Sequence, residues 1–175
     1  MPVGALSLPI SSVLTGQPEV IGHSVLTGAA ASVSFQFPVV YRAVLVEWWI
    51  NTSQDAAIWL RLNNDSGTNY SRQYIGANGA TVSGARATGE TKIGTVNSTG
   101  GTDGASASIL VVKTTAAARA QVIQTGGMLA PASIRLELIG GEWNNTADLL
   151  SRIDILPSAG NLDANTAITL WGFRL

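Results

Sequence analysis

Two glutamates are the candidates for catalytic chemistry in this sequence. Glu47 and Glu137 each lie in a strand-like run beside aromatic or apolar residues, and a glycosidase needs two carboxyl groups close together across a groove. Alternation places Glu47 with Leu45 and Trp49, and it places Glu137 opposite its leucine neighbours, so we expect both to point outward from a sheet, each paired with an arginine. A polysaccharide-degrading enzyme stays an alternative to a chain without catalytic residues.

The single histidine adds no further chemistry. His23 lies beside Gly22 in an irregular part of the chain, where we expect a solvated loop residue, so a Ser-His-Asp triad or a His-based metal site lacks material. The glycines at 100, 101 and 104 lack the lysine and the strand-to-helix setting of a phosphate-binding loop. The sequence therefore predicts a non-enzymatic protein without a cofactor.

Residues 63–70 form the most informative local stretch. They are rich in turn-forming residues whose side-chain oxygens can bind backbone amides. A calcium loop needs several charged ligands, whereas this stretch holds one carboxylate, that of Asp65. We therefore expect no bound metal and a structural loop that stabilises itself, with its motif built by Asn63, Asn64, Asp65, Gly67, Asn69 and Tyr70.

The five tryptophans could form a surface that stacks on sugars. Trp48 alternates in phase with Val44, Val46 and Ile50, which predicts a core position for it. Three others fall opposite the main apolar face of their strands, so they lie either under loops or on a contact surface. These candidate contact-surface aromatics are Trp49, Trp59 and Trp171.

The composition is typical of a protein that contacts other proteins. Charged residues make up 12% of the 175 positions, about half the usual share of roughly 25%. Such a surface costs little to desolvate against a partner. Ten basic and eleven acidic residues give a net charge of −1, so neither nucleic acid nor an anionic membrane is an expected partner.

The start of the chain and the absence of cysteine bear on where the protein folds. Residues 1–16 carry no lysine or arginine before their apolar residues, and Pro9 interrupts them, so we expect no secretory leader. No segment is long enough to span a bilayer. With no cysteine, packing must supply the stability, and we expect folding in a reducing cytoplasm.

Period-two alternation predicts an all-β fold. Ala43–Ile50 alternates regularly, and residues 58–62 follow after a turn-forming stretch at 51–55, which predicts a hairpin. Further β-rich runs bounded by Gly, Asn, Asp or Pro lie at residues 109–112, 134–139, 152–156 and Ala167–Phe173. Many short strands with such connections favour a β-sandwich or jelly roll.

Two segments give weaker signals. Residues 114–125 are Ala-rich but end at two glycines, so they fit a helix and a strand equally well. Residues 76–108 hold mainly Gly, Ala, Thr, Ser and Asn with few apolar anchors, and we expect long loops with one weak hairpin there.

The N-terminal part contains a repeated pentapeptide. Ser-Val-Leu-Thr-Gly occurs at 12–16 and again at 24–28. The repeat is either a coincidence between two similar strands or part of an extended arm that docks on equivalent neighbouring surfaces through Val13, Leu14, Val25 and Leu26. We expect residues 1–32 to form an N-terminal arm and residues 33–175 to form a jelly-roll β-sandwich domain.

Several short motifs together resemble a family of phage virion proteins. Residues 60–70 read Leu-Arg-Leu-Asn-Asn-Asp-Ser-Gly-Thr-Asn-Tyr, similar to the family pattern L-R-x-N-x-D-x-G-x-N-Y. Gly-Glu-Trp at 141–143, Ile-Asp-Ile at 153–155, Gly-Asn-Leu at 160–162 and Leu-Trp-Gly-Phe at 170–173 resemble its later elements in the same order. Leu162 and Trp171 stand where the family has Phe and Tyr. The resemblance covers about residues 33–175.

The resemblance implies a jelly-roll β-sandwich on phage particles, usually a trimer, with no catalytic residues. The leading expectation is a capsid decoration or cement protein of the virion, assembled in the cytoplasm of the host bacterium. Its partners would be copies of itself in a homotrimer and the major capsid protein or other virion proteins. The alternative is a carbohydrate-binding module of a tail fibre or baseplate, whose tryptophans stack on a host surface glycan.

Overall fold

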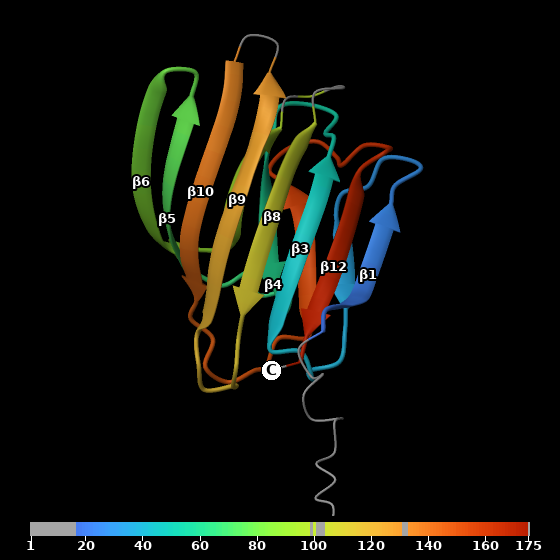
Figure 1. Ribbon diagram of the computed structural model, residues 1–175, viewed down its shortest axis with the longest axis vertical. Coiled ribbons are helices and arrows are strands. Elements are labelled where there is room, and N and C mark those ends of the chain that lie inside the picture. The colour runs from blue at the N-terminus through green and yellow to red at the C-terminus, as the bar shows by residue number, and fades with distance from the viewer. Residues whose placement is uncertain (1–16, 99, 101–103, 131–132, 175) are drawn as a thin grey trace, which may run out of the picture.

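The computed structural model describes residues 17–98, 100, 104–130 and 133–174, and within them it contains strands but no helix (Figure 1). The strands are β1 (Glu19–Val25), β2 (Val33–Gln36), β3 (Ala43–Ile50), β4 (Ala56–Leu62), β5 (Tyr70–Asn78), β6 (Thr81–Glu90), β7 (Ile93–Ser98), β8 (Ala105–Val112), β9 (Ala120–Ala130), β10 (Ser133–Trp143), β11 (Arg152–Pro157) and β12 (Ala167–Phe173).

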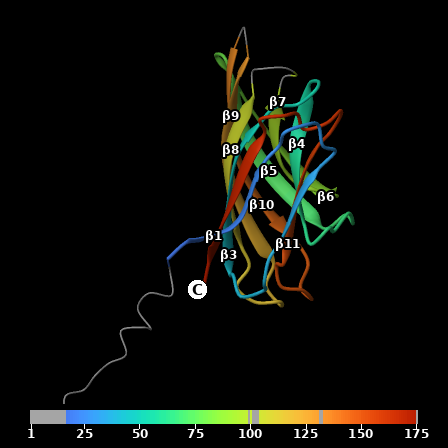
Figure 2. The ribbon, with the colours of Figure 1, turned by 90° about the vertical axis from the view of Figure 1, so that its right-hand side faces the viewer.

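The strands form two antiparallel sheets that face each other as a β-sandwich (Figure 2). The large sheet has the order β1-β12-β3-β8-β9-β10-β5-β6, and the small sheet has the order β2-β11-β4-β7. We call β1, β12, β3 and β8 the covered half of the large sheet, and β9, β10, β5 and β6 its extended half. Among the described residues, the small sheet contacts the extended half mainly through its edge strand β7. The predicted all-β, two-sheet class is confirmed.

The core forms between the sheets where alternation is regular. In β3, Val46, Trp48 and Ile50 are buried, whereas Glu47 and Trp49 on the other face are exposed. The predicted hairpin between β3 and β4 is wrong, because β3 pairs with β12 and β8 while β4 pairs with β11 and β7. Both strands bury one face, and the connection between them crosses from one sheet to the other so that the two faces meet.

The two weak segments are mostly strand. Residues 76–108 contain the end of β5, all of β6 and β7 and the start of β8, so the expectation of long loops is wrong. Strand β6 is exposed along most of its length, which removes the apolar alternation that would have revealed it. Residues 114–125 adopt turns and then enter β9 at Ala120, so the helical alternative is also wrong.

Part of the expected arm belongs to the large sheet. Strand β1 pairs with β12 at the edge of that sheet, so the sandwich begins well before residue 33. Val25 is exposed at the end of β1, and Leu26 packs partly buried against the core. The other copy of the pentapeptide, with Val13 and Leu14, lies outside the described residues.

Candidate functional site

Strand β10 turns its leucines outward. Leu136 and Leu138 are 62% and 50% exposed on the outer face of the large sheet, whereas Glu137 between them is 8% exposed on the inner face. The prediction that Glu137 points outward is therefore wrong. That prediction assumed that the leucines face the core. Ile139 and Trp143, further along the same strand, are buried, and Glu137 shares their face of the sheet.

The exposed leucines belong to a larger apolar surface on the extended half. Leu138 lies between Ile75 of β5 and Thr125 of β9, and Leu136 lies between Ala77 and Gly127. None of these neighbours is charged. We call the exposed aliphatic residues of this face the outer patch: Ile75, Val82, Ile123, Ile134, Leu136 and Leu138.

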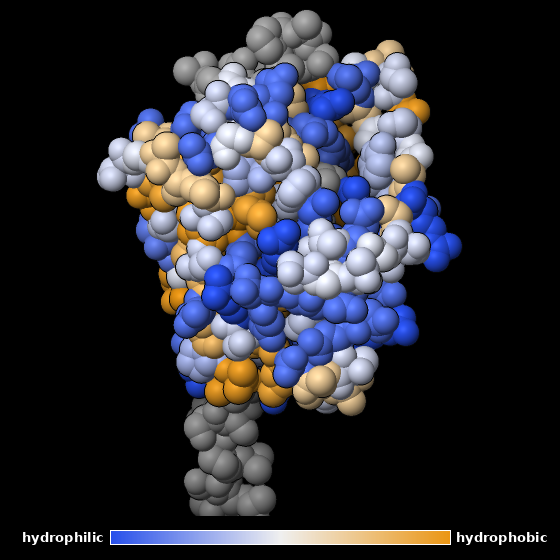
Figure 3. All heavy atoms as spheres, turned by 180° about the vertical axis from the view of Figure 1, so that it is seen from behind, coloured by the Kyte–Doolittle hydropathy of each residue, from blue (hydrophilic) through white to orange (hydrophobic). Residues whose placement is uncertain are grey.

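The outer patch is large for a chain of this size. Its members are between 50% and 72% exposed, so together they present on the order of 600 Å² of apolar surface, at the upper end of what single-chain proteins expose in one patch. The opposite side of the molecule differs, because hydrophilic residues cover much of its middle (Figure 3). The apolar exposure is therefore concentrated on one sheet face.

Asp65 organises the structural loop. Its Oδ1 accepts the backbone N–H of Gly67 at 2.8 Å, and its Oδ2 accepts Asn69 Nδ2 at 2.9 Å and Trp143 Nε1 at 2.6 Å. Burial raises the pKa of Asp65, but these three donors outweigh it and hold the pKa below its ordinary value. A methyl group on Gly67 would lie 3.0 Å from Asp65 Oδ1, which explains the glycine.

Asn63 and Tyr70 close the same loop. Asn63 has a φ of 52° and Asn64 a φ of 57°, a left-handed conformation that asparagine tolerates. The Asn63 side chain donates to the Leu149 carbonyl and accepts the N–H groups of Ser151 and Arg152, which ties the loop to the start of β11. The buried Tyr70 hydroxyl accepts the Leu62 N–H at 3.0 Å, and burial raises its pKa.

Lys113 completes this end of the sandwich, although no sequence pattern predicts it. It is 1% exposed, and its Nζ donates to the carbonyls of Ala116, Ala118 and Asn145 while lying 5.3 Å from the ring centre of Trp143. Burial lowers its pKa. An isolated lysine in a sequence gives no signal that the backbone carbonyls of two loops surround it.

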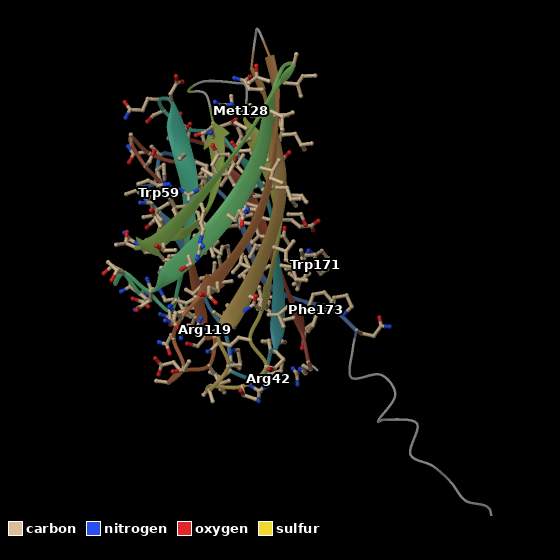
Figure 4. All side chains as sticks on the ribbon, turned by 90° about the vertical axis from the view of Figure 1, so that its left-hand side faces the viewer. Arg42, Trp59, Arg119, Met128, Trp171 and Phe173 are labelled. Atoms are coloured by element: carbon tan, nitrogen blue, oxygen red, sulfur yellow. The ribbon has the colours of Figure 1, made fainter. Side chains whose placement is uncertain are left out.

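The three candidate contact tryptophans do not share a surface. Trp49 and Trp171 lie on the outer face of the large sheet, whereas Trp59 lies on the small sheet, on the opposite side of the molecule from Trp171 (Figure 4). Trp171 Nε1 donates to Glu47 Oε2 at 2.8 Å, and Lys92 Nζ lies 3.9 Å from the Trp59 ring centre. Trp49 remains 47% exposed.

The two candidate catalytic glutamates face opposite sides of the large sheet. Glu47 is exposed on the outer face and binds Trp171 in place of the expected arginine, while Glu137 is buried on the inner face. They cannot flank one substrate bond.

His23 is exposed as expected but lies in β1 and not in a loop, with Nδ1 3.0 Å from the Thr169 hydroxyl. Among the described residues, no three His, Cys, Asp or Glu residues gather as a metal site.

Glu137 borders a polar cleft between the extended half and β7. Its Oε1 accepts Asn97 Nδ2 at 3.0 Å. Burial raises the pKa of Glu137, and the charges of Arg135 and Arg72 and the Asn97 hydrogen bond offset this only in part. The cleft also contains the ring of Tyr74. It therefore combines a carboxyl group with a raised pKa, two cations and an aromatic ring.

Comparison with known proteins gives no further identification. No protein-family model matches the chain, and no curated protein matches it. In the part of the chain that the structure describes, no helix is long and apolar enough to cross a membrane.

Proposed function

We propose that this chain is a structural protein of a bacteriophage particle, most specifically a capsid decoration or cement protein that binds the assembled head shell and stabilises it. A subunit that binds the assembled shell and not free coat protein stabilises the shell by mass action, and repetition over many sites multiplies the effect.

The observation that carries this proposal is the outer patch. A face that exposes several large aliphatic side chains on adjacent strands gains free energy when another protein covers it. Its area approaches the roughly 800 Å² that each partner buries in a standard interface. Because the patch carries no charge for an oppositely charged partner to neutralise, a second copy of the same chain fits it. We assign the patch to contacts within a homotrimer.

The strand order supports a jelly-roll assignment within this proposal. The covered half, β1-β12-β3-β8, faces β2-β11-β4-β7, and two four-stranded sheets with this order correspond to two interlocked Greek keys. The hairpins β5–β6 and β9–β10 then extend one sheet of the jelly roll.

The tail-fibre or baseplate alternative depended on tryptophans that stack on one glycan. Trp59 and Trp171 point to opposite sides of the molecule (Figure 4), and Trp171 Nε1 donates to Glu47 Oε2. The three tryptophans therefore do not form one stacking surface, and only Trp49 and Trp171 share a face.

The test is the copy number of this chain in purified virions, measured by quantitative mass spectrometry relative to the major capsid protein. A decoration or cement protein predicts a ratio of about one third or more, because it repeats across the lattice. A handful of copies per particle would contradict shell decoration and favour the tail alternative, and absence from the particle would contradict both.

A further inference from the structure

The polar cleft beside Glu137 is a cavity between the extended half of the large sheet and β7. Four strands of the large sheet lie beyond β8, whereas the small sheet ends at β7. The cavity has a volume of about 280 Å³ and is lined by residues of β10, β5 and β6 together with Asn97 of β7 and Ala57 of β4. Small-molecule sites begin at roughly 300 Å³. The space therefore suits one small polar ligand better than a peptide or a protein surface.

Glu137 gives the cavity a hydrogen-bond acceptor that is almost fully buried. It is 8% exposed, and its Oε1 accepts the Asn97 amide at 3.0 Å. An ionised carboxylate can accept about four hydrogen bonds, so hydroxyl groups of a ligand can add to the one from Asn97. A nearly buried carboxyl group with a raised pKa that lines a cavity is a candidate for ligand binding.

Two guanidinium groups set the preferred charge of the ligand. Arg72 and Arg135 both line the cavity, and both are close enough for their charges to act on Glu137. With Glu137 ionised, the described lining has a net charge of +1. Guanidinium groups bind carboxylates through paired N–H donors. An anionic ligand is therefore favoured over a cationic one.

Tyr74 and Gly76 shape the floor of the cavity. Tyr74 lines it from β5, and an aromatic ring packs well against the C–H face of a sugar. Gly76 pairs with Glu137 across the two strands, and a methyl group on it would lie 3.4 Å from the Tyr74 ring and 3.7 Å from Glu137 Cγ. The glycine thus keeps open the space between the ring and the carboxyl group.

We propose that this cavity binds one sugar unit that carries a carboxylate, such as a uronic acid. The sugar carboxylate pairs with the guanidinium groups, the ring packs on Tyr74, and the hydroxyl groups bind Glu137 and Asn97. A neutral sugar would not use the positive charge, and inorganic phosphate would not use the tyrosine ring. The site lies on the inner face of the sheet. The sugar-binding proposal can therefore be tested separately from the outer patch and from shell binding.

The test is a titration of the full chain with D-glucuronate, followed by amide chemical shifts in proton–nitrogen NMR spectra. D-glucose and inorganic phosphate are the matched probes. We expect shifts in β5, β7 and β10, and a dissociation constant at least about tenfold lower for glucuronate than for either probe. Arg135→Gln should weaken glucuronate binding by about tenfold or more, while Trp171→Phe, outside the cleft, should leave it unchanged.

Gly76→Ala is the second variant, because its methyl group fills the space at ordinary contact distances and should not disturb folding. It should weaken glucuronate binding while the spectrum stays dispersed. No glucuronate-dependent shift at about 50 mM ligand would overturn the proposal. Equal affinity for phosphate would reduce the cleft to a simple anion site, and equal affinity for glucose would remove the role of the arginines; either outcome contradicts the proposal.

Discussion

Strands β3 and β10, one in each half of the large sheet, differ in which of their side chains they turn outward. In the covered half, β3 buries Val46 and Trp48 beneath the small sheet and exposes Glu47. In the extended half, β10 buries Glu137 and exposes Leu136. Both strands alternate with the same period of two residues. They differ in what covers each face, because the small sheet lies over the first half and contacts the second mainly along β7.

This contrast separates structural residues from residues available to partners. At the end of the sandwich, the groups around Asp65 find their hydrogen-bond partners within the chain. In the extended half, the outer patch presents apolar area to solvent and the inner face borders a cavity. The loop around Asp65 thus contributes to stability, and we place both binding proposals on the two faces of the extended half.

The largest expected effect compares two isoleucines on β10 itself. Ile139 is fully buried and Ile134 is 69% exposed. In the monomeric Leu138→Glu background, where trimer contacts do not contribute, Ile139→Ala should lower the free energy of unfolding by about 2–5 kcal/mol, whereas Ile134→Ala should change it by less than about 0.5 kcal/mol. Urea denaturation of the two variants measures the difference. Equal losses would mean that the outer face is packed within the chain and would contradict the assigned polarity of β10.

An intermediate effect is expected for Asp65→Asn. The substitution removes the negative charge that accepts three N–H groups and should cost about 1.5–3 kcal/mol at pH 7. Because the folded-state pKa of Asp65 is lowered, its stabilising contribution is present above the unfolded-state pKa of about 4 and is lost as the pH falls through the folded-state pKa. Thermal unfolding of both proteins from pH 7 down to pH 2 should therefore converge.

Asn63→Ala is a useful reference for that series, because the Asn63 side chain also bonds backbone groups but carries no charge. Its loss of stability should be nearly independent of pH. An Asp65→Asn difference that stayed constant over the same range would mean that the aspartate charge does not stabilise the loop.

The smallest effect is expected for Glu137→Gln, which should increase the stability of the fold and not decrease it. Burial raises the folded-state pKa of Glu137, so its contribution to stability is fully present below the unfolded-state pKa of about 4 and is lost as the pH rises through the folded-state pKa. Glutamine cannot ionise, so the variant should gain stability relative to the wild type between pH 4 and pH 7. Melting temperatures across this range measure the gain. A variant that instead lost stability toward pH 7 would show that ionised Glu137 is stabilised in the cleft.

The sequence predicts the fold best where the small sheet covers the strand. Alternation in β3 and β12 matches their buried faces, because the hydrophobic effect there decides orientation. Alternation also predicts that β10 exists. It gives this strand the wrong orientation, because its apolar face is assumed to point inward. Strand β6 is missed because solvent lies along most of it and its residues are not selected for burial.

Only the local contacts of the candidate functional site could be predicted from the sequence. The turn chemistry of Asn63 and Asp65 indicates a self-stabilised loop, and the loop geometry agrees with that interpretation. The partners that complete it, Trp143 and Lys113, are far away in sequence and are brought in by the sheet topology. The cleft depends on which strand pairs with which, and no local motif encodes that.

The most direct test of the assembly proposal is the molar mass of the purified chain by sedimentation equilibrium, over a range of concentrations. The matched variants are Leu138→Glu in the outer patch and Val39→Glu, which changes a similarly exposed aliphatic residue outside it. We predict three times the chain mass of 18.1 kDa for the wild type and for Val39→Glu, and 18.1 kDa for Leu138→Glu. A wild type that stays monomeric at every concentration, or a Leu138→Glu variant that still forms the trimer, would contradict the account.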